Sequence, residues 1–139
     1  MRDGFLTALG IMFGVVGSFF SQWDSLIVTL VVFMAIDFVT GFVAASVFKV
    51  SKHGKAGLES KVCWKGLYKK GVALLICLMA AYFDQLLGTS FVHRAVAIGF
   101  IVSESISIVE NAGLMGVPIP AQLKDAIAIL KYKAKEDGE

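Results

Sequence analysis

Four long apolar stretches, separated by short polar segments, dominate the pattern along the chain. They cover residues 5–22, 26–48, 71–87 and 91–109. A helix needs about 20 mainly apolar residues, within a range of roughly 17–25, to cross the hydrocarbon core of a bilayer. The pattern therefore predicts an all-α integral membrane protein whose four transmembrane helices form two hairpins. Residues 1–139 are expected to form a single membrane domain.

The first stretch is short for a membrane span. Phe5 to Phe20 reaches spanning length only when Ser21 and Gln22 are included. Small side chains recur on one face at helical spacing, at Thr7, Gly10, Gly14, Gly17 and Ser21. In lipid, such a face lets two helix backbones approach closely, so the three glycines are predicted to be helix-packing positions. A signal peptide or an interfacial helix is the alternative, and either would leave three spans.

Residues 49–70 form a basic segment between the second and third stretches. It holds seven lysines against one acidic residue, Glu59. Short lysine-rich loops beside membrane spans stay in the cytoplasm, so this loop and, by the span count, both termini are predicted to be cytoplasmic. Ser60 is expected to cap a short amphipathic helix in the headgroup plane. The basic side chains predicted to set the topology and contact lipid there are Lys61, Lys65, Lys69 and Lys70.

Asp37 lies in the second stretch, roughly 16 Å from its start at 1.5 Å per residue, and therefore near the bilayer midplane. An ionised carboxylate at that depth costs at least ~2.5–3.5 kcal/mol, so it should be protonated, paired or facing water. Thr40 and Gly41 share its helical face, and Gly41 is also predicted to be a helix-packing position. This face indicates either a hydrogen-bonded contact inside a bundle or a surface that meets a pore or a partner subunit, and the second interpretation is favoured.

Two further sets of polar residues occur in the later stretches. Glu104 lies in the inner half of the fourth stretch, and Ser103 and Ser107 add to its polar side. Such a face must point at protein or water, because lipid cannot satisfy it. Asp84 and Arg94 flank the short turn before this stretch and are predicted to form a structural ion pair.

The C-terminal tail, residues 113–139, begins with a helix-breaking segment from Gly113 to Pro120. From Ala121 onward, apolar and lysine positions alternate at helical spacing, which predicts a short amphipathic helix at the cytoplasmic surface.

The composition agrees with the membrane class. Hydrophobic residues make up 57 % of the chain, against roughly 45–50 % in soluble domains. The basic residues are not interleaved with base-stacking aromatics, so nucleic-acid binding is the weaker explanation for the net charge of +2. Cys63 and Cys77 lack metal or redox spacing, and His53 and His93 are interpreted as surface histidines. Because phosphate-loop, zinc and hydrolase motifs are missing, the sequence predicts a non-enzyme without a cofactor or metal.

Four motifs occur in a fixed order over roughly residues 26–133. They are Asp37–Gly41, Ser60–Lys70 with its Lys65-Gly66-Leu67 core, Ser103–Asn111 and Gly116–Pro120. In order and spacing they resemble the bacteriophage holins of the toxin-secretion and phage-lysis type. Ser103 stands where many members of that family carry asparagine.

This resemblance implies a small protein of the host bacterial cytoplasmic membrane that associates with itself into a homo-oligomer. Its pores or lesions would release an endolysin, without stable binding to it, for host cell lysis, while relatives export toxins. A lumen could then hydrate Asp37 and Glu104, and depolarisation could bias assembly if these acids sense the field. The alternatives are a small ion channel or transporter with a polar path through the same two acids, and a membrane adaptor that recruits a cytoplasmic partner.

Overall fold

The computed structural model describes residues 2–21, 24–50 and 60–138, and within these ranges every regular element is a helix. The five helices are α1 (Arg2–Ser21), α2 (Ser25–Ser46), α3 (Ser60–Leu87), α4 (Phe91–Leu114) and α5 (Ala121–Asp137). The predicted all-α class is confirmed. Trp23, the loop at 51–59 with His53, and the surroundings of Gly17 lie outside the described residues.

Among the described residues, three helices are long and apolar enough to cross a membrane. They are α2 with 22 residues, α3 counted from Lys61 with 27, and α4 with 24. These helices correspond to the second, third and fourth apolar stretches of the sequence. Large apolar side chains on their outer faces are exposed, among them Phe42, Leu75 and Leu86, and lipid would cover such surfaces.

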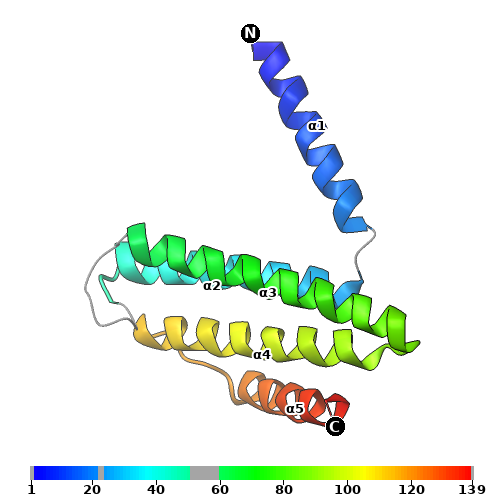
Figure 1. Cartoon of the computed structure of the whole chain (residues 1–139). Coiled ribbons are helices and arrows are strands. Elements are labelled where there is room, and N and C mark those ends of the chain that lie inside the picture. The colour runs from blue at the N-terminus through cyan, green and yellow to red at the C-terminus, as the bar shows by residue number, and fades with distance from the viewer. Residues whose placement is uncertain (1, 22–23, 51–59, 139) are drawn as a thin grey trace.

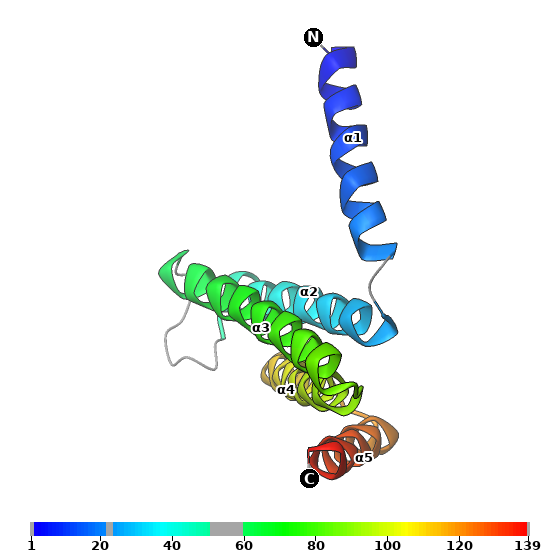
Figure 2. The same ribbon diagram turned by 45° about the vertical axis from the view of Figure 1, so that its right-hand side comes forward.

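Helix α1 stands apart from the other four helices (Figures 1 and 2). Its 20 residues extend about 30 Å at 1.5 Å per residue, which equals the thickness of a typical hydrocarbon core. Most of its described apolar side chains, including Phe5, Leu6 and Ile11, are exposed. A fourth span formed by α1 stays a prediction.

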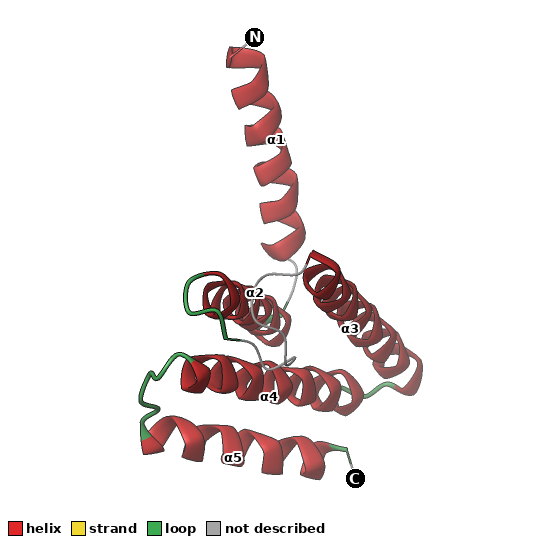
Figure 3. Ribbon diagram, turned by 90° about the vertical axis from the view of Figure 1, so that its left-hand side faces the viewer, coloured by secondary structure: helices red, strands yellow, loops and turns green. Residues whose placement is uncertain are grey.

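The centre of the bundle lies where α2 and α3 pack on one side of α4 (Figure 3). Its buried side chains are Leu30, Met34, Ala73, Cys77 and Ile101. Small residues such as Ala73 and Cys77 let the helix backbones come close, which is how helices associate in lipid without a hydrophobic driving force.

Helix α3 runs without a break from Ser60 to Leu87, which corrects the prediction of a headgroup-plane helix followed by a separate span. Gly66 and Gly71 fall inside it, and each costs a helix only about 1 kcal/mol relative to alanine. The 28 residues extend about 42 Å, so the lysine-rich first turns can project beyond a hydrocarbon core of about 30 Å.

The turn between α3 and α4 is built on Asp84, which is buried. Its carboxylate accepts hydrogen bonds from the Thr89 hydroxyl at 2.7 Å and from the backbone N–H groups of Val92 at 3.1 Å and His93 at 2.8 Å. Gly88 supplies the left-handed conformation, with φ +66°, that closes the end of α3. The predicted ion pair with Arg94 is therefore wrong: Arg94 is exposed, and the carboxylate instead satisfies the first N–H groups of α4.

A second carboxylate links the starts of α2 and α4. Asp24 caps α2 by accepting a hydrogen bond from the Ile27 N–H at 3.0 Å. Its other oxygen lies 2.6 Å from His93 Nε2. Since His93 stands near the beginning of α4, α2 and α4 start at the same end of the bundle and run parallel. His93 is thus part of a helix–helix contact and not the surface residue predicted.

The C-terminal helix α5 is present as predicted, but it folds back along α4 (Figures 1 and 3). Gly116, with φ +79°, ends α4. The N–H groups of Gly116 and Val117 bond back to the carbonyls of Gly113 and Ala112, at 3.0 and 2.9 Å, a pattern that satisfies the last carbonyls of a helix.

We predict that Asp84→Ala lowers the thermal unfolding midpoint of the protein in detergent micelles, followed by far-ultraviolet circular dichroism. The first turn of α4 would lose its acceptor for two backbone N–H groups. The matched control is Arg94→Ala, for which we expect a much smaller change. Equal losses in the two variants would instead support the ion pair.

Candidate functional site: a charged cluster between three spans

The parallel course of α2 and α4 explains why their acidic residues meet. Asp37 lies twelve residues after Ser25, and Glu104 lies thirteen residues after Phe91. At 1.5 Å per residue these are about 18 and 20 Å from the helix starts, so both acids lie at nearly the same depth. Helix α3 runs in the opposite direction and brings Lys70, in its third turn, to that level.

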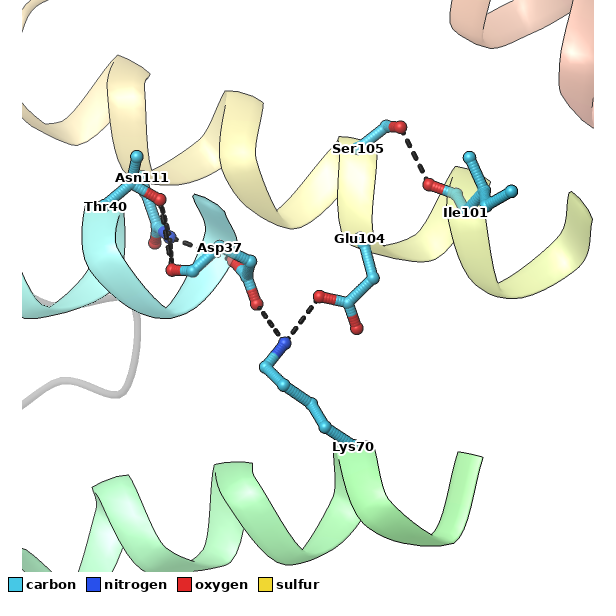
Figure 4. A network of polar contacts seen from close by, with 7 residues as sticks. All are labelled: Asp37, Thr40, Lys70, Ile101, Glu104, Ser105 and Asn111. Atoms are coloured by element: carbon cyan, nitrogen blue, oxygen red, sulfur yellow. Dashed lines mark hydrogen bonds and ion pairs between the residues drawn. The ribbon is translucent and has the colours of Figure 1, made fainter. Parts of the chain in front are cut away.

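Lys70 bridges the two acids (Figure 4). Its Nζ atom lies 2.7 Å from Asp37 Oδ2 and 2.5 Å from Glu104 Oε2. All three side chains are only 14 % exposed, so their charges are largely withdrawn from the surface of the bundle. The cluster joins one helix each from the second, third and fourth apolar stretches. It carries one positive and two negative formal charges.

Asn111 completes the cluster from the next turns of α4 and is 3 % exposed. Its side-chain Nδ2 donates to Asp37 Oδ1 at 3.1 Å, to the Asp37 carbonyl at 3.3 Å and to Thr40 Oγ1 at 3.0 Å. The Thr40 hydroxyl in turn donates to the Asp37 carbonyl at 3.1 Å. The Asp37 carboxylate is therefore held by a cation and an amide from two other helices.

Gly41 leaves room for this amide. A Cβ atom at position 41 would lie 3.5 Å from Asn111 Nδ2, an ordinary contact, so alanine fits while a larger side chain would displace the asparagine. The other described glycines predicted to pack helices, Gly10 and Gly14, have no neighbouring atoms within 4 Å of such a Cβ. Their packing role remains a prediction for a partner outside this chain.

The remaining predicted site residues lie on α4 and α3 and differ in their exposure. Ser107 is half-buried on α4, while Ser103 is exposed. Lys61, Lys65 and Lys69 are exposed on α3, as a headgroup-contacting set requires. Lys70 differs from them: the prediction that it faces lipid is wrong, because it points into the bundle and pairs with both acids.

Sequence reasoning missed Lys70 as the counter-ion and did not select Asn111 as a site residue. A signal for Lys70 existed, because it is the last lysine before an uninterrupted apolar stretch and lies at bilayer depth if that helix begins at Ser60. The cluster pairs two carboxylates with one shared cation within a single chain, and these ion pairs would break if the helices moved apart.

We predict that Lys70→Ala destabilises the bundle by about 3 kcal/mol, the order of magnitude for removing one partner of a buried ion pair. Two carboxylates would then face each other without a cation. The measurement is the free energy of unfolding in micelles. Lys69→Ala, at an exposed neighbouring position, serves as control and should change it by less than about 0.5 kcal/mol. Equal changes in the free energy of unfolding for the two variants would show that the ion-pair bridge makes no specific contribution to stability.

Comparison with known proteins matches the chain to a family. A family model described as the bacteriophage holin family matches residues 14–132, a range that includes the complete cluster. No solved structure matches the chain.

Individual relatives agree with that match. An uncharacterized 14.9 kDa protein in the nagH 3' region of Clostridium perfringens is 37 % identical over 116 residues, which cover 82 % of this chain and 83 % of the relative. An uncharacterized protein of Listeria monocytogenes is 36 % identical over 125 residues, covering 88 % and 84 %. A protein of Bacillus phage phi105, named "Probable holin", is 29 % identical over 103 residues, covering 73 % and 71 %. The chain belongs to the bacteriophage holin family.

Proposed function

We propose that this protein is a holin that associates with itself in the bacterial cytoplasmic membrane and forms lesions through which an endolysin, or in related systems a toxin, leaves the cytoplasm. The observation that carries the proposal is the family match across residues 14–132. The three long apolar helices support a multi-pass membrane location. The endolysin needs only passage, so no stable complex with it is required, and the protein acts without catalysing a reaction.

The proposed topology has four spans, with α1 as the first. Both termini and the basic loop would then be cytoplasmic, as the clustering of lysines near the start of α3 favours. Asp24 and the turn at Gly88 would lie together on the outer side, consistent with the contact between Asp24 and His93. The whole chain would act as one membrane domain.

The charged cluster gives the proposed holin a closed resting state. Asp37 and Glu104 are paired inside a single chain, so they do not need a water-filled lumen to be tolerated. We therefore assign the cluster to a latch that holds α2, α3 and α4 together before lesions open. Opening requires Lys70 to leave the carboxylates and water to replace it. The membrane potential acts on such charges with about 2.3 kcal/mol per elementary charge per 100 mV, so depolarisation can bias this step.

Small-ion conduction is the second candidate function. Charged side chains inside a membrane bundle often line ion or proton paths, and the three bridged side chains retain 14 % exposure. This candidate predicts passage of small ions without passage of a folded protein.

The test is inducible expression in bacteria, with and without a cytoplasmic endolysin that lacks its own export signal. We expect abrupt lysis, after a delay with normal growth, only when both proteins are present. Ion leakage and growth arrest without lysis would favour the channel. No effect in either culture, with the protein present in the membrane, would contradict both and leave an adaptor role.

Variants of the cluster test the latch. We expect Asp37→Asn, Glu104→Gln and Lys70→Gln to shorten the delay before lysis, because each weakens the bridge between α3 and the other two helices. Lys69→Gln should leave the delay unchanged. The measurement is lysis time at matched amounts of protein in the membrane. Unchanged timing in the Asp37 and Glu104 variants would show that these carboxylates do not control opening.

A further inference from the structure

Helix α4 carries a second buried face, separate from the one that meets α2 and α3. Ile98, Val102 and Ser105 are buried, but they do not belong to the core formed with α2 and α3, to which α4 contributes Ile101. Their spacing of four and three residues places them in one stripe along the helix. Figure 4 shows Ser105 pointing away from Glu104 and Lys70. We call these three residues the outer stripe.

Helix α5 is the element that covers the outer stripe. It packs against α4 on the side away from α2 and α3 (Figures 1 and 3). Its half-buried apolar side chains, Ile127, Leu130 and Ala134, recur at intervals of three and four residues. Two apolar stripes, one on each helix, therefore face each other.

This cover is incompatible with lipid around α4. The exposed side of α5 carries Lys124, Asp125, Lys131, Lys133, Lys135 and Glu136. Its 17 residues extend about 25 Å back along α4, almost the depth of a hydrocarbon core of about 30 Å. Charged side chains placed in lipid cost about 2.5–3.5 kcal/mol each near the centre. Once α4 spans the membrane, α5 is more stable at the aqueous surface than on α4.

The connection between the two helices permits this movement. The last carbonyls of α4 accept hydrogen bonds from the N–H groups of Gly116 and Val117. The C-terminal end of α4 therefore stays hydrogen-bonded when α5 moves away. Gly116, with φ +79°, lies where the chain reverses. Residues 115–120 thus form a hinge outside both helices.

We propose that α5 is a removable cover and that, in the membrane, the outer stripe of a second copy of this chain takes its place on α4. The inference rests on the self-association in the proposed function and names its surface. A two-fold arrangement brings the stripe against itself, and the serine at position 105 allows the close approach that favours helix pairs in lipid. Its hydroxyl already donates a hydrogen bond to the Ile101 carbonyl at 2.7 Å. The hydroxyl therefore needs no new hydrogen-bond partner in such a contact.

Disulfide crosslinking between full-length chains tests the assignment. In a background with Cys63→Ser and Cys77→Ala, single cysteines are introduced by Val102→Cys in the stripe and by Ser103→Cys, an exposed neighbouring position that lies about 100° further around the helix. Membranes from expressing bacteria are oxidised, and carbonate extraction confirms insertion. We expect covalent dimers from Val102→Cys and few from Ser103→Cys.

A second arm tests the competition by α5. Adding Ile127→Asp and Leu130→Asp to Val102→Cys weakens the cover and should raise early dimer yield by about threefold or more, because it shifts the population toward uncovered α4. Adding Gln122→Ala and Ala128→Ser, which alter exposed uncharged positions of α5, should leave the yield unchanged. An unchanged yield in the Asp variants would contradict the covering role.

The remaining outcomes separate the two proposals. Equal crosslinking at both positions, or none at position 102, would overturn the stripe as the self-association surface. Crosslinking of Gly10→Cys in one chain with Val102→Cys in another would overturn it as well, by assigning the stripe to α1. Stripe dimers without lysis in the endolysin experiment would keep this inference and reject the holin function, whereas lysis without stripe dimers would do the reverse.

Discussion

The structure depends on the pairing of charges at bilayer depth. Lipid is as apolar as the core side chains, so burial alone discriminates poorly between relative positions of membrane helices. An unpaired charge in lipid is costly, which makes the pairing of Lys70 with Asp37 and Glu104 far more selective. The three charges belong to three helices. Their pairing therefore determines which faces of α2, α3 and α4 meet and how far each helix is shifted along the bundle relative to the others.

The features that were predictable are those set by local sequence. Length and hydropathy predict α2 and α4, whereas the orientation inferred from the basic loop stays a prediction. The start of α3 at Ser60 and its end at Leu87 were predicted, but not its continuity, because a change from lysine-rich to apolar sequence is a change of solvent and not of backbone conformation. Gly66 and Gly71 do not stop a helix, so the chain crosses from headgroups to hydrocarbon within one continuous element.

The charged cluster was only half predictable, for a physical reason. Asp37 and Glu104 are conspicuous because each interrupts an apolar stretch. Lys70 stands among other lysines and differs from them only in where the helix directs it, which depends on packing. The same holds for Asp84: its charge suggested Arg94 as a partner, but the geometry of the turn offers two closer backbone N–H groups.

In the proposed mechanism, assembly and opening are separate steps because they use two different faces of α4. The outer stripe can exchange α5 for another copy while Lys70 still bridges the acids on the opposite side. Closed protomers can therefore accumulate as oligomers without leaking ions. Opening comes later and requires the bridges to break in neighbouring chains, where each hydrated cluster lowers the cost of water for the next. Delay followed by abrupt lysis then follows from the order of two events on one helix, without an external timer.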